Sequence, residues 1–146
     1  MRHLFTAGGD DVEIDDDPTR VDVDALWTFL STEAYWARWR RRVDLEIQLG
    51  TAWRVVGAYD GTGMIAFARA ISDGVALAYL ADVYVEERAR GRGLGVEVVR
   101  TMVEDAPAER LRWMLHTRDA HGLYARFGFT APDGTYVERP PGVGSA

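Results

Sequence analysis

Apolar residues recur at helical spacing over the first third of the chain. One helix is predicted to begin after Asp22, a residue type that caps helix N-termini, and to end at a break over residues 31–35. A second helix is predicted over residues 36–49, with Gly50 as its C-cap. The apolar side of this second helix is expected to contain Trp39, Val43 and Ile47, with its arginines mostly outside.

Beyond residue 51 the apolar pattern changes to period two, the repeat of a half-buried strand. Strands are predicted over residues 52–59, 64–71 and 75–85. The turns between them are short and rich in Asp and Gly, so these strands must be antiparallel neighbours.

The last third of the chain predicts a parallel addition to this sheet. A helix over residues 94–105 is followed by a strand over 111–116 and a short helix over 119–126, and a final hairpin from Phe129 and residues 135–137 would fit the remainder. Strand, helix and strand in sequence predict a right-handed crossover. The expected fold class is α+β, a mostly antiparallel twisted sheet with about four helices.

Residues 10–17 contain six acidic side chains. The simplest interpretation is a solvated N-terminal edge, although Val12 and Ile14 alternate with acids and would allow a short first strand. We expect one domain over residues 1–146, with flexible ends at residues 1–11 and 140–146.

The composition excludes several classes of protein. The net charge of −6 argues against nucleic-acid binding, and no apolar run is long enough for a membrane span. All seventeen basic residues are Arg, and Lys and Asn are absent, which indicates a GC-rich bacterial genome. With no Cys and no metal-ligand spacing among the three His residues, we expect no metal and a cytoplasmic location.

A glycine-rich turn stands where the strand over residues 75–85 gives way to a helix. Residues 90–95 read Arg-Gly-Arg-Gly-Leu-Gly, and such a turn before a helix N-terminus makes an anion site. It matches neither a Walker A motif, which needs Gly-Lys-Ser/Thr, nor a dinucleotide fingerprint, because Val96 stands where the third glycine would be.

Two motifs carry a resemblance to a known family. Val83-x-Val85 followed by Arg90-x-x-Gly93-x-Gly95 resembles the acetyl-CoA signature Q/R-x-x-G-x-G/A of the GNAT superfamily of N-acetyltransferases, and residues 120–129 resemble that family's A-x-x-L-Y-x-K/R-x-G-F segment. The resemblance covers residues 12–138 and implies the GNAT fold, in which the strands over 75–85 and 111–116 splay apart beside a β-bulge.

The resemblance implies how acetyl-CoA would bind. Its pyrophosphate would lie on backbone amides of residues 90–96, and its pantetheine arm would pair with the backbone of residues 83–85. Thr117 stands where many members have an Asn that bonds the pantetheine, and Arg126 is a candidate for the 3′-phosphate. The implied cosubstrate-binding residues are Val83, Tyr84, Val85, Arg90, Gly91, Arg92, Gly93, Leu94, Gly95, Val96, Thr117 and Arg126.

The resemblance also implies catalytic residues. Tyr124 matches the tyrosine that protonates the departing CoA thiolate in many members. Asp82 is the candidate base for the acceptor amine, because burial would raise the pKa of its carboxyl group. Asp82 bonding the backbone at a bulge or binding a substrate cation, His116 as a base, and deprotonation through water all remain open alternatives.

The implied activity is transfer of acetyl from acetyl-CoA to a primary amine of a small molecule or peptide, by direct attack in a ternary complex. A non-catalytic acyl-CoA-binding module on the same fold is the alternative. The acidic protein weakly favours cationic acceptors, and either a monomer or a homodimer is expected. The acceptor pocket is expected to involve Tyr35, Trp36, Trp39 and Tyr79.

Overall fold

The computed structural model describes residues 1–34 and 40–142 as six strands and four helices, with short 3-10 turns between some of them. The sheet order is β1-β2-β3-β4-β5-β6; every neighbouring pair is antiparallel except β5 and β6. This architecture confirms the expected α+β class. The strands are β1 (Arg2–Ala7), β2 (Asp10–Asp15), β3 (Arg54–Asp60), β4 (Gly63–Ser72), β5 (Leu77–Val85) and β6 (Arg112–Met114), and the helices are α1 (Val23–Thr32), α2 (Arg42–Thr51), α3 (Leu94–Glu104) and α4 (His121–Ala125).

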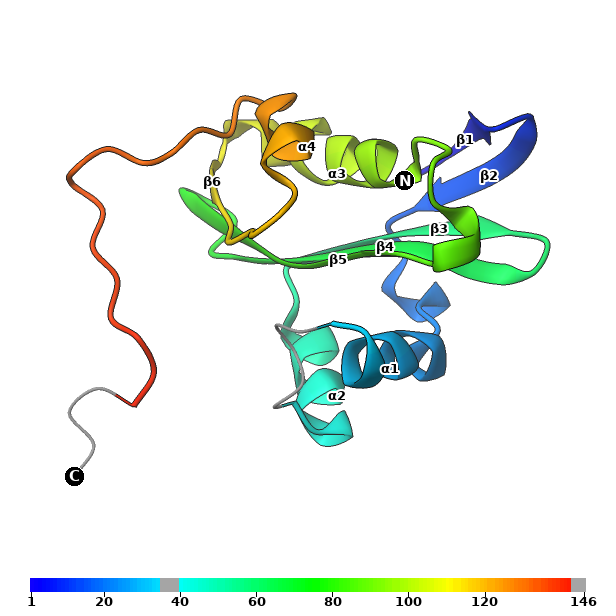
Figure 1. Cartoon of the computed structure of the whole chain (residues 1–146), viewed down its shortest axis with the longest axis horizontal. Helices are drawn as coiled ribbons and strands as arrows, with labels where there is room; N and C mark the ends of the chain where they lie inside the picture. The colour runs from blue at the N-terminus through cyan, green and yellow to red at the C-terminus, as the bar shows by residue number, and fades with distance from the viewer. Residues whose placement is uncertain (35–39, 143–146) are drawn as a thin grey trace.

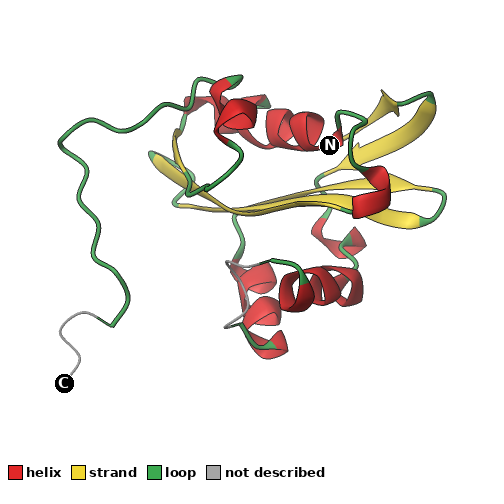
Figure 2. Cartoon of the chain, in the orientation of Figure 1, coloured by secondary structure: helices red, strands yellow, loops and turns green. Residues whose placement is uncertain are grey.

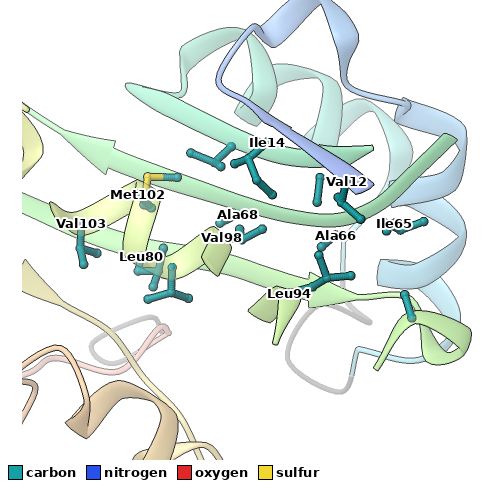
Figure 3. Close-up of a cluster of buried hydrophobic side chains, with 14 of the residues drawn as sticks. Val12, Ile14, Ile65, Ala66, Ala68, Leu80, Leu94, Val98, Met102 and Val103 are labelled. Carbon is teal, nitrogen blue, oxygen red and sulfur yellow. The ribbon is translucent and has the colours of Figure 1, made fainter. Parts of the chain in front are cut away.

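The helices form a layer on each face of the sheet. Helices α3 and α4 lie on one face and α1 and α2 on the other, as Figures 1 and 2 show. Each layer has its own core. The α3 core joins Leu94, Val98 and Met102 to inward-facing alanines of β4, seen in Figure 3. The α1 core joins Leu26 and Phe29 to Phe67 and Tyr84.

The N-terminal residues form a hairpin rather than a flexible end. Strand β1 pairs with β2 over its whole length, and Val12 and Ile14 of β2 are fully buried. The nearly buried Asp15 is stabilised by Arg20, whose Nη1 lies 2.8 Å from its carboxylate. The alternation of β2 buries Val12 and Ile14, and Arg20 pairs with Asp15, the one acid of the strand that is buried.

The first helix confirms its predicted cap, whereas the second differs from its prediction. The carboxylate of Asp22 accepts a hydrogen bond from the Ala25 N–H at 3.0 Å. In α2 the buried residue is Leu45, while Val43 and Ile47 are 47% and 59% exposed. Apolar residues at alternate positions of a helix fall on opposite sides, so their pattern did not specify the buried side. Gly50 lies inside α2 rather than at its C-cap, and Trp39 lies outside the described residues.

The chain after α4 contains no further strand up to residue 142, so the final hairpin considered from the sequence is not formed in this described segment. Strand β6 is also shorter than predicted, with three residues. Its pairing with β5 covers only Leu77–Tyr79, and beyond Tyr79 the two strands separate. This separation is the splay that the family resemblance implied.

A β-bulge at Ala81 changes the side of the sheet to which β5 residues point. Arg69 pairs with Asp82, but its neighbour Ala70 pairs with Leu80, so Ala81 is the extra residue. Leu80 packs in the α3 core, whereas Tyr84 packs in the α1 core. The bulge therefore directs Asp82 and Tyr84 to the α1 face.

Candidate functional site

A cleft of about 950 Å³ occupies the space where β5 and the segment after β6 separate. It is lined from both faces of the sheet. We call the side next to α3 and α4 the α3 half; it contains Val83, Val85, Arg90, Gly95, Thr117 and Tyr124. We call the opposite side the α1 half; it contains Phe29, Arg40, Gln48, Arg69, Ile71 and Tyr79.

The glycine-rich turn forms the end of the α3 half. Gly91 and Gly93 have φ angles of 79° and 80°, which favour glycine, and Gly93 is the N-cap of α3. A Cβ on Gly95 would lie 3.4 Å from Val85 Cγ2, which is an ordinary van der Waals contact, so the packing of α3 on β5 does not itself require glycine here. Because the first N–H groups of a helix lack intrahelical acceptors, this turn can bind an anion.

The arginines near this turn have different roles. Arg90 lines the cleft and donates from Nε to the Val85 carbonyl at 3.1 Å. Arg92 turns towards the N-terminal hairpin and pairs with Asp10 at 3.1 Å, and Arg88 pairs with Glu86. Arg126, at the end of α4, is exposed and outside the cleft lining. Of these four side chains, Arg90 is the one placed to contact a ligand in the cleft.

The remaining predicted residues of this half contribute by backbone or by packing. Leu94 is buried in the α3 core, and Val96 lies in the first turn of α3 outside the cleft lining. Thr117 accepts a hydrogen bond from the Ala120 N–H at 3.0 Å, which fixes the start of α4, and its hydroxyl can still donate. Tyr124 is nearly buried and packs edge-on against Phe129, with ring centroids 5.8 Å apart.

Asp82 belongs to a buried charge cluster with Arg40 and Arg69 of the α1 half, and is not itself part of the cleft lining. Arg40 donates two hydrogen bonds of 3.0 Å to its carboxylate, and Arg69 donates one of 2.8 Å from Nε. The side chain of Asp82 is 0% exposed and those of both arginines are 4% exposed. Burial alone would raise the pKa of Asp82, but the hydrogen bonds and charges of Arg40 and Arg69 outweigh it, and the pKa lies below its usual range.

The expectation that Asp82 has a raised pKa is therefore wrong. A carboxylate that is this well stabilised as an anion is a poor proton acceptor, and its oxygens are already occupied by guanidinium groups. Backbone hydrogen bonding by Asp82 at the bulge stays a prediction, since these contacts are to side chains. Asp82 instead fixes the positions of two arginines at the cleft.

A second group of polar side chains, linked by close contacts, lies at the exposed mouth of the cleft. The Tyr79 hydroxyl is 2.6 Å from His116 Nδ1, and His116 Nε2 is 3.3 Å from the Glu138 carboxylate. Burial raises the pKa of Tyr79, with further contributions from Tyr136, Glu138 and Asp82, so its hydroxyl stays protonated. Tyr79 can thus donate to Nδ1 while Nε2–H donates to Glu138.

Eight of the sequence-predicted site residues line the cleft: Tyr79, Val83, Tyr84, Val85, Arg90, Gly95, Thr117 and Tyr124. Tyr35, Trp36 and Trp39 lie outside the described residues. The sequence did not single out Arg40, Gln48, Arg69 or Glu138. Arg69 had a signal, because it is the charged residue in the otherwise apolar strand over residues 64–71, and a buried charge needs a partner.

With this geometry, the family can be identified. The family model described as "Acetyltransferase (GNAT) family" matches residues 21–129. These residues include the α1 core, the part of the α3 core that lies beyond the N-terminal hairpin, the glycine-rich turn and Tyr124. The chain belongs to the GNAT family of acetyltransferases.

Solved structures agree with this assignment. A GNAT-family protein from Xanthomonas campestris pv. campestris is 33% identical, with a TM-score of 0.83 over 92% of this chain and 97% of that one. Two more distant structures share the fold. A GNAT acetyltransferase from Streptococcus pneumoniae TIGR4 is 16% identical, with a TM-score of 0.68 over 88% of this chain and 99% of that one. A ribosomal-protein-alanine N-acetyltransferase from Brucella melitensis biovar Abortus 2308 is 20% identical, with a TM-score of 0.58 over 88% of this chain and 98% of that one. No curated protein sequence matches the chain significantly.

The described residues contain neither a candidate membrane span nor a candidate metal site. No helix in this part of the chain has the length and hydrophobicity to cross a bilayer. Within residues 1–34 and 40–142, no three His, Asp or Glu side chains are grouped so that they could hold a metal ion.

Proposed function

We propose that this protein transfers the acetyl group of acetyl-CoA to a primary amine by direct attack. The observation that carries the proposal is the continuity of the cleft with the glycine-rich turn. The edge of β5 beyond Tyr79 has no strand partner among the described residues, and it leads to the N-terminus of α3. An extended, amide-containing chain with a phosphate at one end matches both features.

Binding would divide acetyl-CoA between these two features. The pyrophosphate would accept hydrogen bonds from backbone N–H groups of residues 91–96, with Arg90 as a further donor. The pantetheine amides would pair with the backbone of Val83–Val85, and the Thr117 hydroxyl would bond the same arm. The thioester would then lie near the bulge, between the α3 half and the α1 half.

In the reaction, the amine nitrogen attacks the thioester carbonyl carbon from the α1 half. A C–N bond forms and the carbonyl oxygen becomes an oxyanion, which a backbone N–H near Val83 would stabilise. The C–S bond then breaks, and the Tyr124 hydroxyl gives its proton to the departing thiolate.

The amine must also lose a proton. We assign its acceptance to His116 rather than to Asp82. The Tyr79 oxygen takes the proton from the amine while the Tyr79 proton passes to His116 Nδ1, and Glu138 stabilises the resulting imidazolium charge. This assignment is supported by the 2.6 Å Tyr79–His116 contact and by the lowered pKa of Asp82.

A ligand series tests the binding step. Acetyl-CoA and desulfo-CoA are both expected to raise the thermal unfolding temperature of the protein, because they share the pyrophosphate and the pantetheine arm, whereas ATP should raise it less. A protein that no CoA species stabilises would not have the proposed site.

Release of free CoA thiol across a panel of amines tests the transfer step. Release that depends on both acetyl-CoA and an amine is expected. Stabilisation by acetyl-CoA without thiol release from any amine class would instead indicate an acyl-CoA-binding module.

A further inference from the structure

Arg69 has a buried guanidinium group that the protein uses only in part. Its side chain is 4% exposed, and it donates one side-chain hydrogen bond, from Nε to Asp82 at 2.8 Å. Within the described part of the chain, Nη1 and Nη2 have no hydrogen-bond acceptor. Since Arg69 lines the cleft, these donors are available to a ligand in the α1 half.

The guanidinium is also fixed in place. Arg69 pairs with Asp82 across β4 and β5, and both project to the α1 face. Asp82 accepts hydrogen bonds from Arg40 as well, so Arg69 shares this carboxylate with another cation. A cation held in one orientation by a shared partner is suited to bind a second anion without losing much side-chain freedom.

A second polar group lies in the same half. Gln48 of α2 lines the cleft, and its side-chain oxygen is buried without a hydrogen-bond partner among the described residues. This oxygen can accept a hydrogen bond from an amine. The α1 half thus offers an anion-binding donor set and an N–H acceptor, next to the apolar side chains of Phe29 and Ile71.

We infer that the acceptor carries a carboxylate close to its amine, as an amino acid does, and that Arg69 binds this carboxylate. The planar guanidinium edge matches the two oxygens of a carboxylate, and Gln48 would accept from the amine. The inference rests on the proposed function for the reaction, but it opposes the weak expectation of a cationic acceptor. The net charge of the whole protein favours cations, whereas the arginines at the cleft favour an anion locally.

A set of matched acceptors tests this inference through thiol release. For each apolar amino acid, the set includes its primary amide and its decarboxylated amine, with a polyamine for comparison. The amino acid is expected to show a kcat/KM at least tenfold above that of its two uncharged analogues. Equal or faster reaction of the amides, the decarboxylated amines or the polyamine would overturn the inference.

The variant Arg69→Gln connects this preference to one residue. It should lower kcat/KM for the amino acid about 10- to 100-fold, while the value for the decarboxylated amine changes little. Arg69→Lys, which keeps the charge, should restore part of the preference. The control is Arg112→Gln, at an exposed arginine of β6 outside the cleft lining, and its preference should be that of the wild type. An equal loss for both substrates in Arg69→Gln would contradict carboxylate binding.

A binding measurement separates this inference from the proposed function. With CoA present, the N-acetylated amino acid should bind the wild-type protein and stabilise it more than the N-acetylated amide does. Arg69→Gln should lose that difference but keep its stabilisation by acetyl-CoA. If no carboxylate binds although acetyl-CoA does and an amine is acetylated, the inference fails and the proposed function stands. If acetyl-CoA does not bind, the proposed function fails.

Discussion

The two halves of the cleft are built by different means. In the α3 half, the main groups are backbone N–H groups of a turn, set by glycines and a helix start within residues 90–96. In the α1 half, the main groups are the side chains of Arg40 and Arg69, which pair with Asp82, up to 42 residues away in the sequence. The first half depends on local backbone geometry, and the second depends on tertiary contacts.

This difference explains how each half can vary. A backbone site accepts many side chains as long as its glycines remain, so it suits a constant ligand. A side-chain site changes with a single substitution, so it suits a ligand that differs between relatives. The variants below are chosen to affect one half and leave the other unchanged.

The largest effect is expected from Asp82→Asn. Removing one partner of a buried ion pair leaves a buried charge uncompensated, which costs about 3–5 kcal/mol of unfolding free energy. Urea unfolding would measure this loss. The control Asp24→Asn, at a side chain that is 83% exposed, should change stability by less than about 0.5 kcal/mol. A loss below about 1 kcal/mol in Asp82→Asn would mean that the cluster contributes little to stability.

The same variant has a defined pH dependence. The folded state lowers the pKa of Asp82, so its ionised form adds stability that is fully present above the unfolded pKa of about 3.9 and is lost as the pH falls through the folded value. The stability difference between wild type and Asp82→Asn should therefore be constant at neutral pH and shrink only below about pH 4. Urea unfolding of both proteins between pH 3 and 7 would measure this difference. A stability difference that already shrinks well above pH 4 would contradict the prediction.

Tyr124→Phe should have the next largest effect. Loss of a general acid lowers kcat by about 100-fold, and the phenyl ring keeps the packing against Phe129. Affinity for acetyl-CoA and the unfolding temperature should remain close to those of the wild type. Steady-state kinetics and thermal shift together check this result, and an unchanged kcat would remove Tyr124 from the mechanism.

Gly93→Ala should affect the α3 half alone. An Ala at a φ of 80° costs about 1–2 kcal/mol and shifts the N–H groups at the start of α3, so affinity for acetyl-CoA should fall about tenfold. Gly74→Ala is the matched control, because Gly74 has a φ of 76° and lies in the turn before β5, at the opposite end of this strand from the glycine-rich turn and outside the cleft lining. Both variants should lose similar stability, and calorimetric titration should find weaker acetyl-CoA binding only in Gly93→Ala.

The smallest effect is expected from Glu138→Gln. Its contact with His116 is solvent-exposed on both sides, so stability should change by less than about 0.5 kcal/mol. Because the carboxylate would orient the His116 ring in the proposed proton path, kcat/KM should still fall about two- to fivefold at neutral pH. The acetyl-CoA affinity should not change. A kcat/KM equal to that of the wild type would exclude Glu138 from the proton path.

The sequence predicted the α3 half well, because motif spacing reports backbone geometry. The turn at residues 90–95, the helix after it and the splay of β5 and β6 are all present. The motif did not report side-chain direction, and Arg92 and Arg126 turn out to lie away from the cleft. Whether the backbone groups bind acetyl-CoA stays a prediction.

The α1 half was less predictable. The buried side of α2 was predicted wrongly because the apolar residues of this helix fall on two sides. The direction of the Asp82 pKa shift depended on partners that no local pattern reveals. In the N-terminal hairpin, the sequence allowed a short strand at Val12 and Ile14 but did not predict its pairing with β1. The buried acid of this hairpin is stabilised by Arg20, a contact that only the folded chain creates.

The extra residue at Ala81 has a consequence for comparing relatives. Burial along β5 follows period two without interruption from Ala78 to Tyr84, yet Leu80 and Tyr84 face opposite sides of the sheet. An alignment guided by hydrophobic alternation would pass through Ala81 without a gap and equate residues from different faces. A relative whose strand lacks the bulge should need a gap at this column. That gap would distinguish relatives by backbone shape, even where their side chains are the same.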